Sequence, residues 1–153
     1  MAIPMCMISL NQGMINKCNS LYTRQENMNQ EENIIQKNIF EWAEGNLQNY
    51  PQLSLLKADA SGLRLSIGNA VKAKRLGITK KGFPDLMLNA SRGGYHALFI
   101  ELKTEKGKVS KEQKEMLQKL WNEGNFTCVC RGFDATIKVI TAYLEGKIET
   151  EVK

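Results

Sequence analysis

Two acids and one lysine stand at positions where a small β-sheet would bring them together. Asp85 opens an apolar run of strand-like length, and Glu101 and Lys103 lie near the end of the next run, residues 97–103. The polar segment 91–95 between the two runs is typical of a hairpin turn. Because side chains alternate across a strand, Glu101 and Lys103 share one face of the sheet. The pattern therefore predicts two carboxylates and a cation at one end of a hairpin.

These side chains suit the hydrolysis of a phosphodiester bond, which needs an acidified water and neutralised charge on the phosphate. A hard divalent cation meets both needs, and Mg²⁺ prefers oxygen ligands while it keeps several waters. Asp85 and Glu101 can supply carboxylate oxygens, and the backbone carbonyl of Leu102 can supply another. Lys103 can orient or deprotonate the attacking water. Pro-Asp or Glu-x-Lys alone is equally typical of a turn or an exposed ion pair, so only the combination indicates a metal-dependent nuclease.

The composition fits one compact domain of 153 residues, with 42% hydrophobic and 24% charged side chains. No apolar run approaches the roughly 18 residues that a membrane span needs, and the N-terminus lacks the basic region of a signal peptide. Cys128 and Cys130 flank one residue of an expected strand, so they face one way and are too few for a zinc ribbon. Buried reduced thiols are the simpler interpretation of these two residues and of Cys6 and Cys18. They indicate an intracellular protein without disulfides.

Positive charge is concentrated just before Asp85. The chain has a net charge of +5, while the segment from Lys57 to Gly82 alone holds seven basic residues and one acid. A basic run is often only a solvated face, but this run leads directly into the candidate site and favours a polyphosphate partner such as DNA. The candidate phosphate contacts within it are Arg64, Lys72, Lys74, Arg75, Lys80 and Lys81.

Hydrophobic spacing and turn residues predict the elements around the hairpin. Residues 1–28 show no clear period, which indicates a poorly ordered N-terminal extension or an element outside the core. The domain proper is expected over 29–146, followed by a short tail, 147–153. Within the domain we expect a helix over 29–44, a strand over 53–58, a short basic helix over 69–76, a helix over 110–123, a strand over 126–131 and a last helix capped by Asp134.

Two further polar residues lie on or near inward-facing stripes of the predicted helices. Glu32 falls close to the apolar stripe of the first helix, and Glu31 is the adjacent alternative. Gln113 precedes three apolar residues at helical spacing, so it lies on the inward stripe of its own helix. Gln113 and Ser110 also complete a capping box, which alone would explain both residues. A surface position for Glu32 and a capping role for Gln113 therefore stand as alternatives to a role in the site.

Taken together, the Pro84-Asp85 pair, the Glu101-Leu102-Lys103 triplet and segment 107–113 resemble the VRR-NUC (virus-type replication-repair nuclease) domain. This family belongs to the PD-(D/E)XK nuclease superfamily, and the resemblance covers roughly residues 29–145. It implies an α/β fold with a restriction-endonuclease-like core, in which α-helices flank a mixed β-sheet of about four strands. It also implies Mg²⁺- or Mn²⁺-dependent cleavage of DNA.

The resemblance implies a role for each of five side chains. Asp85 and Glu101 resemble the metal-binding acids, and Lys103 resembles the catalytic lysine. Gln113 matches the family's glutamine after the Glu-x-Lys strand, and Glu32 matches its first-helix acid. Standalone members are similar to Holliday-junction-cleaving enzymes that act as homodimers. We therefore expect an endonuclease on branched DNA in replication, recombination or repair.

Two other functions are compatible with such a fold. A catalytically silent protein that binds structured DNA is the main alternative, although it would have no need of an intact Asp85, Glu101 and Lys103. A site-specific restriction enzyme would need a recognition element larger than the basic segment offers.

Overall fold

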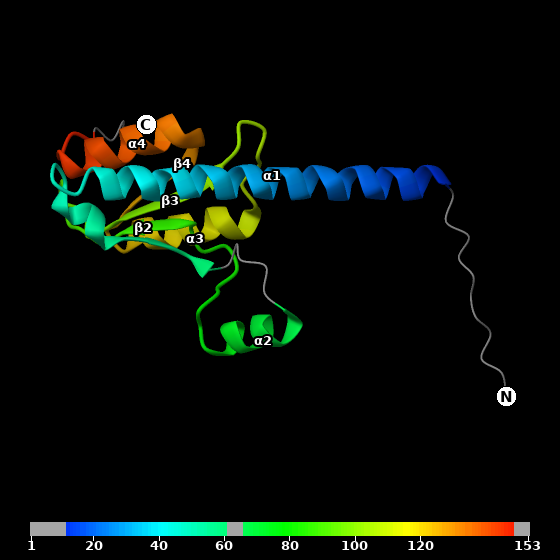
Figure 1. The fold of residues 1–153 in the computed structure, drawn as a ribbon. Coiled ribbons are helices and arrows are strands. Elements are labelled where there is room, and N and C mark those ends of the chain that lie inside the picture. Colours follow the sequence, from blue (N-terminus) through cyan, green and yellow to red (C-terminus); the bar gives the residue numbers. More distant parts are fainter. Residues whose placement is uncertain (1–11, 61–65, 149–153) are drawn as a thin grey trace.

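The fold is a layered arrangement of helices around one small sheet (Figure 1). The structure is a computed structural model of the chain, and it describes residues 12–60 and 66–148. Along the chain the elements are α1 (Gln12–Gly45), the 3-10 helix η1 (Pro51–Leu55), β1 (Leu56–Ala58), α2 (Ile67–Arg75), β2 (Leu86–Leu88), β3 (Leu98–Lys103), α3 (Lys111–Asn122), β4 (Phe126–Arg131) and α4 (Gly132–Leu144).

Four strands form one mixed sheet in the order β1-β2-β3-β4. β2 pairs antiparallel with both β1 and β3, and β3 pairs parallel with β4. A parallel pair needs a crossover connection, which contains α3. The predicted hairpin between β2 and β3 is confirmed, and Arg92 and Tyr95 form a bridge inside its turn. The expected α/β fold, with a mixed sheet of about four strands flanked by helices, is confirmed as well.

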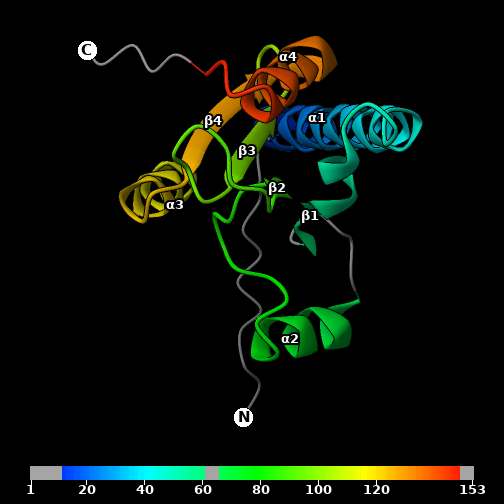
Figure 2. The ribbon, with the colours of Figure 1, turned by 90° about the vertical axis from the view of Figure 1, so that its left-hand side faces the viewer.

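Alternation along β3 divides its buried side chains between the hydrophobic core and a second face, which carries Phe99, Glu101 and Lys103. Leu98, Ile100 and Leu102 are buried in a hydrophobic cluster that includes residues of α1 and α4. The intervening Glu101 and Lys103 point to the opposite face because successive strand residues alternate. Figure 2 shows α1 and α4 on one side of the sheet and α3 on the other. The shared face predicted for Glu101 and Lys103 is therefore confirmed.

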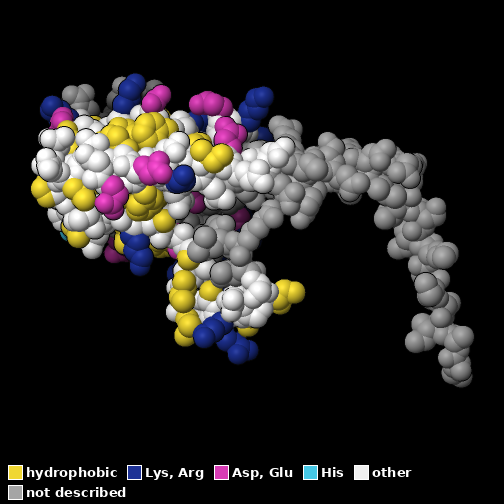
Figure 3. All heavy atoms as spheres, viewed as in Figure 1, with side chains coloured by type: hydrophobic (Ala, Val, Ile, Leu, Met, Phe, Trp, Pro, Cys, Tyr) yellow, Lys and Arg dark blue, Asp and Glu magenta, His cyan; other side chains and the backbone are white. Residues whose placement is uncertain are grey.

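The short helix α2 stands away from this body in both ribbon views (Figure 1, Figure 2). Ser66 caps it by accepting a hydrogen bond from the Asn69 N–H at 3.4 Å, and Ala73 alone among its residues is buried. Its lysines and its arginine are exposed, and Figure 3 shows basic side chains gathered on this projection. α2 is thus a basic arm beside the sheet, close to the position predicted for a short basic helix.

The first helix is longer than the sequence pattern indicates. α1 begins at Gln12, so residues 12–28 are helical and match the second alternative, an element outside the core, while residues 1–11 lie outside the described part of the chain. Neither Pro nor Gly interrupts the chain between Gly13 and Gly45, and its Met, Gln and Glu residues favour a helix even without an apolar stripe. Periodicity reports burial, so it misses a helical segment that projects from the body (Figure 1).

Two shorter elements also differ from the prediction. Pro51 starts the 3-10 helix η1, which takes in residues 53–55 of the expected strand, because the fixed backbone angle of proline suits the first turn of a helix. Only Leu56–Ala58 remains as a strand. α4 begins at Gly132, so Asp134 lies in the first turn instead of capping the helix, where its charge still suits the helix dipole.

The structure also bears on the cysteines and on membrane spans. In the described residues, no helix is both long and apolar enough to cross a bilayer. Cys128 and Cys130 are free thiols whose sulfur atoms lie 3.8 Å apart on one face of β4, as predicted. Cys6 and the side chain of Cys18 lie outside what the structure describes.

Candidate active site

Asp85 is fixed at the start of β2 by hydrogen bonds to two neighbouring strands. Its backbone carbonyl accepts a hydrogen bond from the Asp59 N–H at 2.9 Å. Its carboxylate Oδ2 accepts one from the Leu102 N–H at 2.8 Å. The β2–β3 register places Asp85 beside Glu101, so the two acids of the sequence pattern meet at one end of the sheet.

Glu101 is completely buried in β3, and its two carboxylate oxygens have different surroundings. Oε1 accepts hydrogen bonds from Lys103 Nζ, at 2.7 Å, and from Gln113 Nε2. Oε2 has no hydrogen-bond donor in the described part of the protein. A buried acceptor without a donor is costly, and such groups in native structures call for an explanation such as an ion.

Lys103 connects β3 with α1 through its buried ammonium group. Nζ donates to the Leu102 carbonyl at 2.6 Å and to Glu101 Oε1. It also lies 3.5 Å from Oε1 of Glu32 on α1. The first-helix acid near the site is therefore Glu32, while the neighbouring Glu31 is exposed. The Leu102 carbonyl, a predicted metal ligand, is the acceptor for Lys103 in this arrangement.

Gln113 both completes the capping box and contacts the site, the two roles that the sequence left as alternatives. Its side-chain Oε1 accepts a hydrogen bond from the Ser110 N–H at 2.8 Å, and Ser110 Oγ accepts one from the Gln113 N–H at 3.2 Å, which completes the capping box. The remaining Nε2 donates to Glu101 Oε1. One amide thus ties the start of α3 to the acid in β3, and the two interpretations are compatible.

Burial dominates the electrostatics of the three acids. It raises the pKa of Glu101 to about 7, with the charge of Asp85 as the next cause. It also raises the pKa of Asp85 and of Glu32, although the Leu102 N–H opposes it at Asp85 and Lys103 opposes it at Glu32. Burial alone would lower the pKa of Lys103, but the hydrogen bond to Glu101 and the surrounding acids outweigh it, so that pKa is raised and the ammonium form is favoured.

The donor set fits a hard divalent cation bound by few protein ligands. Glu101 Oε2 lacks a donor among residues 12–60 and 66–148, and the carboxylate of Asp85 lies close enough to raise the pKa of Glu101. Among the described residues, no three Asp, Glu, His or Cys side chains gather closely enough to form a complete metal cage. Mg²⁺ is commonly held by one or two carboxylates, with waters and substrate phosphate completing its shell. Asp85 and Glu101 therefore match a Mg²⁺-type site and would not suit a structural zinc site.

The metal-free protein is expected to lose stability as the pH rises, because of Glu101. The pKa of this residue in the folded protein, about 7, lies above its ordinary 4.5, so the folded state holds the proton more tightly than the unfolded chain. The resulting contribution of Glu101 to the free energy of unfolding is at most about 3 kcal/mol. It is fully present below the ordinary pKa and is lost as the pH rises through the pKa of the folded protein. Urea unfolding in EDTA across this range measures it. A wild type and a Glu101→Gln variant with parallel pH dependence would contradict it.

If the site cleaves DNA with a bound metal ion, as the sequence predicts, Glu32→Gln is expected to slow cleavage by about tenfold, the lower end of the effect of removing an outer partner of a metal site. The neutral amide would weaken the contact with Lys103 Nζ, which is 3.5 Å from Glu32 Oε1, and so loosen the lysine's orientation. Glu31→Gln is the matched control, because Glu31 is the exposed neighbour. Single-turnover cleavage rates compare them. Equal losses in both variants would show that Glu32 has no special position.

Three residues that support the site carried no clear signal in the sequence. Gly107 packs so closely on Lys103 that a Cβ would lie 3.1 Å from its Cδ. Arg131, at the end of β4, donates to the carbonyls of Thr104 and Gly107 at 2.9 and 2.7 Å and so fixes the loop after β3. Gly82 has a φ of 79°, and a Cβ there would meet backbone atoms of α3 at 2.7 Å.

The predicted phosphate contacts fall into three groups. Arg64 lies outside the described residues. Lys81 is ion-paired with Glu112 at the start of α3, so part of its charge is already compensated. The remaining ones are exposed on α2 or on the loop that follows it, namely Lys72, Lys74, Arg75 and Lys80. They form a basic surface on the arm and its loop, separate from the buried Lys103.

Two acids and a buried lysine lie together at the end of a mixed α/β sheet, which is the arrangement predicted for a nuclease-type protein, and comparison with known proteins supports that class of protein. The family model of the VRR-NUC domain matches residues 26–134. A solved structure described as a VRR-NUC domain protein is similar at 30% identity with a TM-score of 0.63, over 75% of this chain and 88% of that one. Curated protein sequences give no match. The chain belongs to the VRR-NUC domain family, a nuclease-type family.

Proposed function

We propose that this protein is a Mg²⁺- or Mn²⁺-dependent endodeoxyribonuclease that cuts branched DNA such as a Holliday junction. The observation on which this rests most is that Oε2 of Glu101, next to the acid Asp85, has no donor in the part of the chain that the structure describes. Two adjacent buried acids repel each other unless a proton or a cation lies between them. Because the chain belongs to a nuclease-type family, a phosphodiester is the group on which that cation is expected to act.

The chain's own groups divide the work of the reaction. Asp85 and Glu101 would hold the ion, which when bound would acidify a water and offset charge on the phosphate. Gln113 and Lys103 both occupy Oε1 of Glu101, which orients the carboxylate and leaves Oε2 for the ion. The raised pKa of Lys103 favours an ammonium that holds the water or the phosphate by a hydrogen bond, rather than a base that takes a proton.

The basic surface of α2 and its loop would bind the DNA backbone. Lys72, Lys74 and Arg75 are exposed on α2, and Lys80 is exposed on the loop that follows it. Figure 3 shows basic side chains gathered on the projecting part of the molecule. Such contacts are independent of base sequence and weaken steeply with salt. Selectivity for DNA structure would then depend on whether one DNA molecule can contact both the basic surface and the active site.

A cleavage panel tests the proposal most economically. Duplex, single strand, flap, fork and four-way junction are incubated with the full chain in Mg²⁺, in Mn²⁺ and in EDTA. We expect cleavage only with metal, and fastest at the branched substrates. Tight binding of a junction without cleavage in any metal would overturn the enzyme and favour a silent DNA-binding protein.

A homodimer is part of the proposal, because two symmetric sites could cut two strands of a junction. Sedimentation velocity of the full chain is expected to show a dimer, alone or on junction DNA. A monomer in both conditions, with junction cleavage intact, would overturn the dimer without affecting the site.

A further inference from the structure

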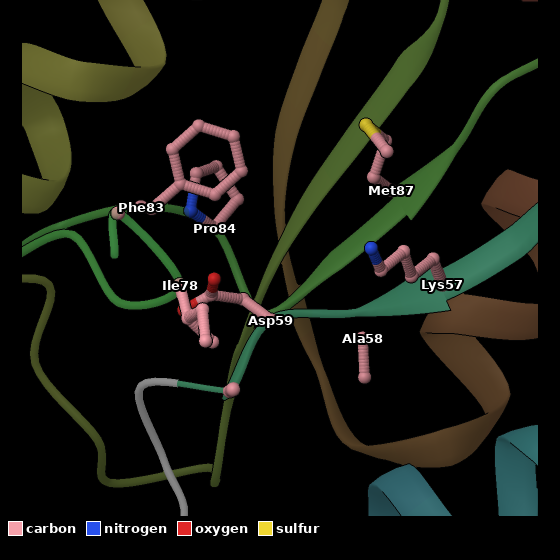
Figure 4. Close-up of a pocket in the computed structure, with 9 residues that line it drawn as sticks. Lys57, Ala58, Asp59, Ile78, Phe83, Pro84 and Met87 are labelled. Carbon is pink, nitrogen blue, oxygen red and sulfur yellow. The ribbon is translucent and has the colours of Figure 1, made fainter. Parts of the chain in front are cut away.

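A cavity of about 310 Å³ opens beside the acids, between the edge of the sheet and the loop after α2 (Figure 4). Its side-chain walls include Ile78, Phe83, Pro84 and Met87, which are apolar, and Lys57 and Asp59, which are charged. In Figure 4, Lys57 lies on the side of Met87, and the Asp59 carboxylate lies on the side of Ile78 and Pro84. The catalytic proposal uses none of these six side chains.

The cavity is continuous with the candidate active site through the backbone. Pro84, in its wall, directly precedes Asp85. Asp59, also in its wall, donates its N–H to the Asp85 carbonyl at 2.9 Å. The register pairs Lys57 with Met87 and Met87 with Phe99, and Phe99 lies two residues before Glu101 on the same face of β3. Cavity and carboxylates therefore share one face of the sheet.

The chemistry of the walls suits a flat group with an apolar face and a polar edge. The ring of Phe83 is fixed edge-on against Phe99, with centroids 5.8 Å apart at 86°. Met87 and Ile78 provide aliphatic surface, and the negative charge of Asp59 would repel a phosphate. Lys57 is exposed and could pair with a phosphate outside the cavity.

We propose that this cavity binds one unstacked nucleobase of the DNA strand whose neighbouring phosphate lies at Asp85 and Glu101. The inference rests on the proposed function for the identity of its ligand. The volume is at the low end of the roughly 300–1,000 Å³ found for small-ligand sites, which suits one base and not a base pair. Extruding a base costs least where it is already unpaired, so the cavity supplies a reason for preferring branched DNA.

The test is a titration of the full chain with nucleosides, followed by the methyl resonances of Met87 and Ile78 in NMR spectra. Thymidine and deoxyadenosine are expected to shift both resonances saturably at millimolar concentration. Deoxyribose 5-phosphate, which has a phosphate and no base, is expected to leave them in place. Absence of a saturable shift with either nucleoside, or equal shifts with the sugar phosphate, would overturn the proposal.

Two substitutions to aspartate, one inside the cavity wall and one outside it, test whether the nucleoside binds in the cavity. Ile78→Asp places a charge in the wall and is expected to weaken nucleoside binding by about tenfold, an effect of the size of one lost base-stacking contact, followed by the Met87 methyl. Leu76→Asp is the control, because Leu76 is also exposed and lies outside the cavity wall. Equal weakening in both variants would overturn the assignment. Amide spectra of both variants report whether they fold.

The result of the nucleoside titration does not depend on whether the protein cuts DNA. Nucleoside binding needs neither metal nor cleavage, so binding in a chain that cuts no DNA would remove the proposed function alone. Cleavage of branched DNA by a chain that binds no nucleoside would remove the cavity proposal alone. Branched DNA is also expected to shift the Met87 methyl in the direction that the nucleosides do, and a shift lost on removal of a single base would locate the bound nucleotide.

Discussion

Glu101→Gln is expected to slow DNA cleavage by at least about 10³-fold, since several kcal/mol of charge stabilisation depend on the bound cation. The amide keeps the size of the side chain and an oxygen for Lys103, but it loses the charge that would hold the ion. The same variant is expected to be more stable than the wild type at about pH 8 in EDTA, because burial of the ionised acid is relieved. The raised pKa of Glu101, about 7, sets the direction of that change.

The combination of lost activity and gained stability distinguishes a functional acid from a structural one. Cleavage is measured under single-turnover conditions and stability by urea unfolding, on the same preparations. Glu105→Gln is the matched control, because Glu105 follows on the loop after β3 and is exposed. A Glu101→Gln variant that cuts DNA at a rate close to that of the wild type would remove Glu101 from the site. A variant that is both inactive and much less stable would assign it a structural role.

Lys103→Met is expected to slow cleavage by about 10²–10³-fold, the usual effect of losing one preorganised donor in an active site. Methionine keeps much of the apolar stem but leaves the Leu102 carbonyl and Glu101 Oε1 without their ammonium donor. It also removes the cation beside three acids, so stability at neutral pH is expected to fall by about 3 kcal/mol, as when one partner of a buried pair is lost.

A second substitution separates the charge of Lys103 from its position. Lys103→Arg keeps the positive charge but replaces a compact ammonium by a planar fork, so we expect stability to recover more than cleavage does. Lys106→Met, at an exposed position in the same loop, controls for the general loss of one basic residue. If Lys103→Met cleaves DNA at a rate within about threefold of the wild type, the effect is far smaller than that expected for such a donor. That result would exclude Lys103 as a donor in the reaction.

The centre of the site was predictable because it depends on local rules. Strand alternation places Glu101 and Lys103 on one face, and a hairpin brings Asp85 to the same end of the sheet. The capping box at Ser110 was also legible, since it depends on residues three apart. The same spacing does not say where the other end of the Gln113 amide points. That end depends on how α3 packs against β3, which is a tertiary fact.

Contacts between distant segments were beyond the sequence pattern. The choice of Glu32 over Glu31 depends on where α1 crosses the end of β3. Arg131 gave no signal, because an arginine at the end of a strand is common and its backbone acceptors lie in another loop. The cavity beside Pro84 is formed by β1 and the segment after α2, whose proximity appears only in the folded chain.

Metal-dependent cleavage of branched DNA by the unmodified chain tests the central claim most directly. The rate on a labelled four-way junction is measured against Mg²⁺ concentration, with an identically purified Asp85→Asn variant to exclude a contaminating nuclease. We predict a rate that rises to saturation with Mg²⁺, vanishes in EDTA and is absent in the variant. Cutting that persists in EDTA, or that is equal in the wild type and the variant, would contradict a metal site built on Asp85 and Glu101.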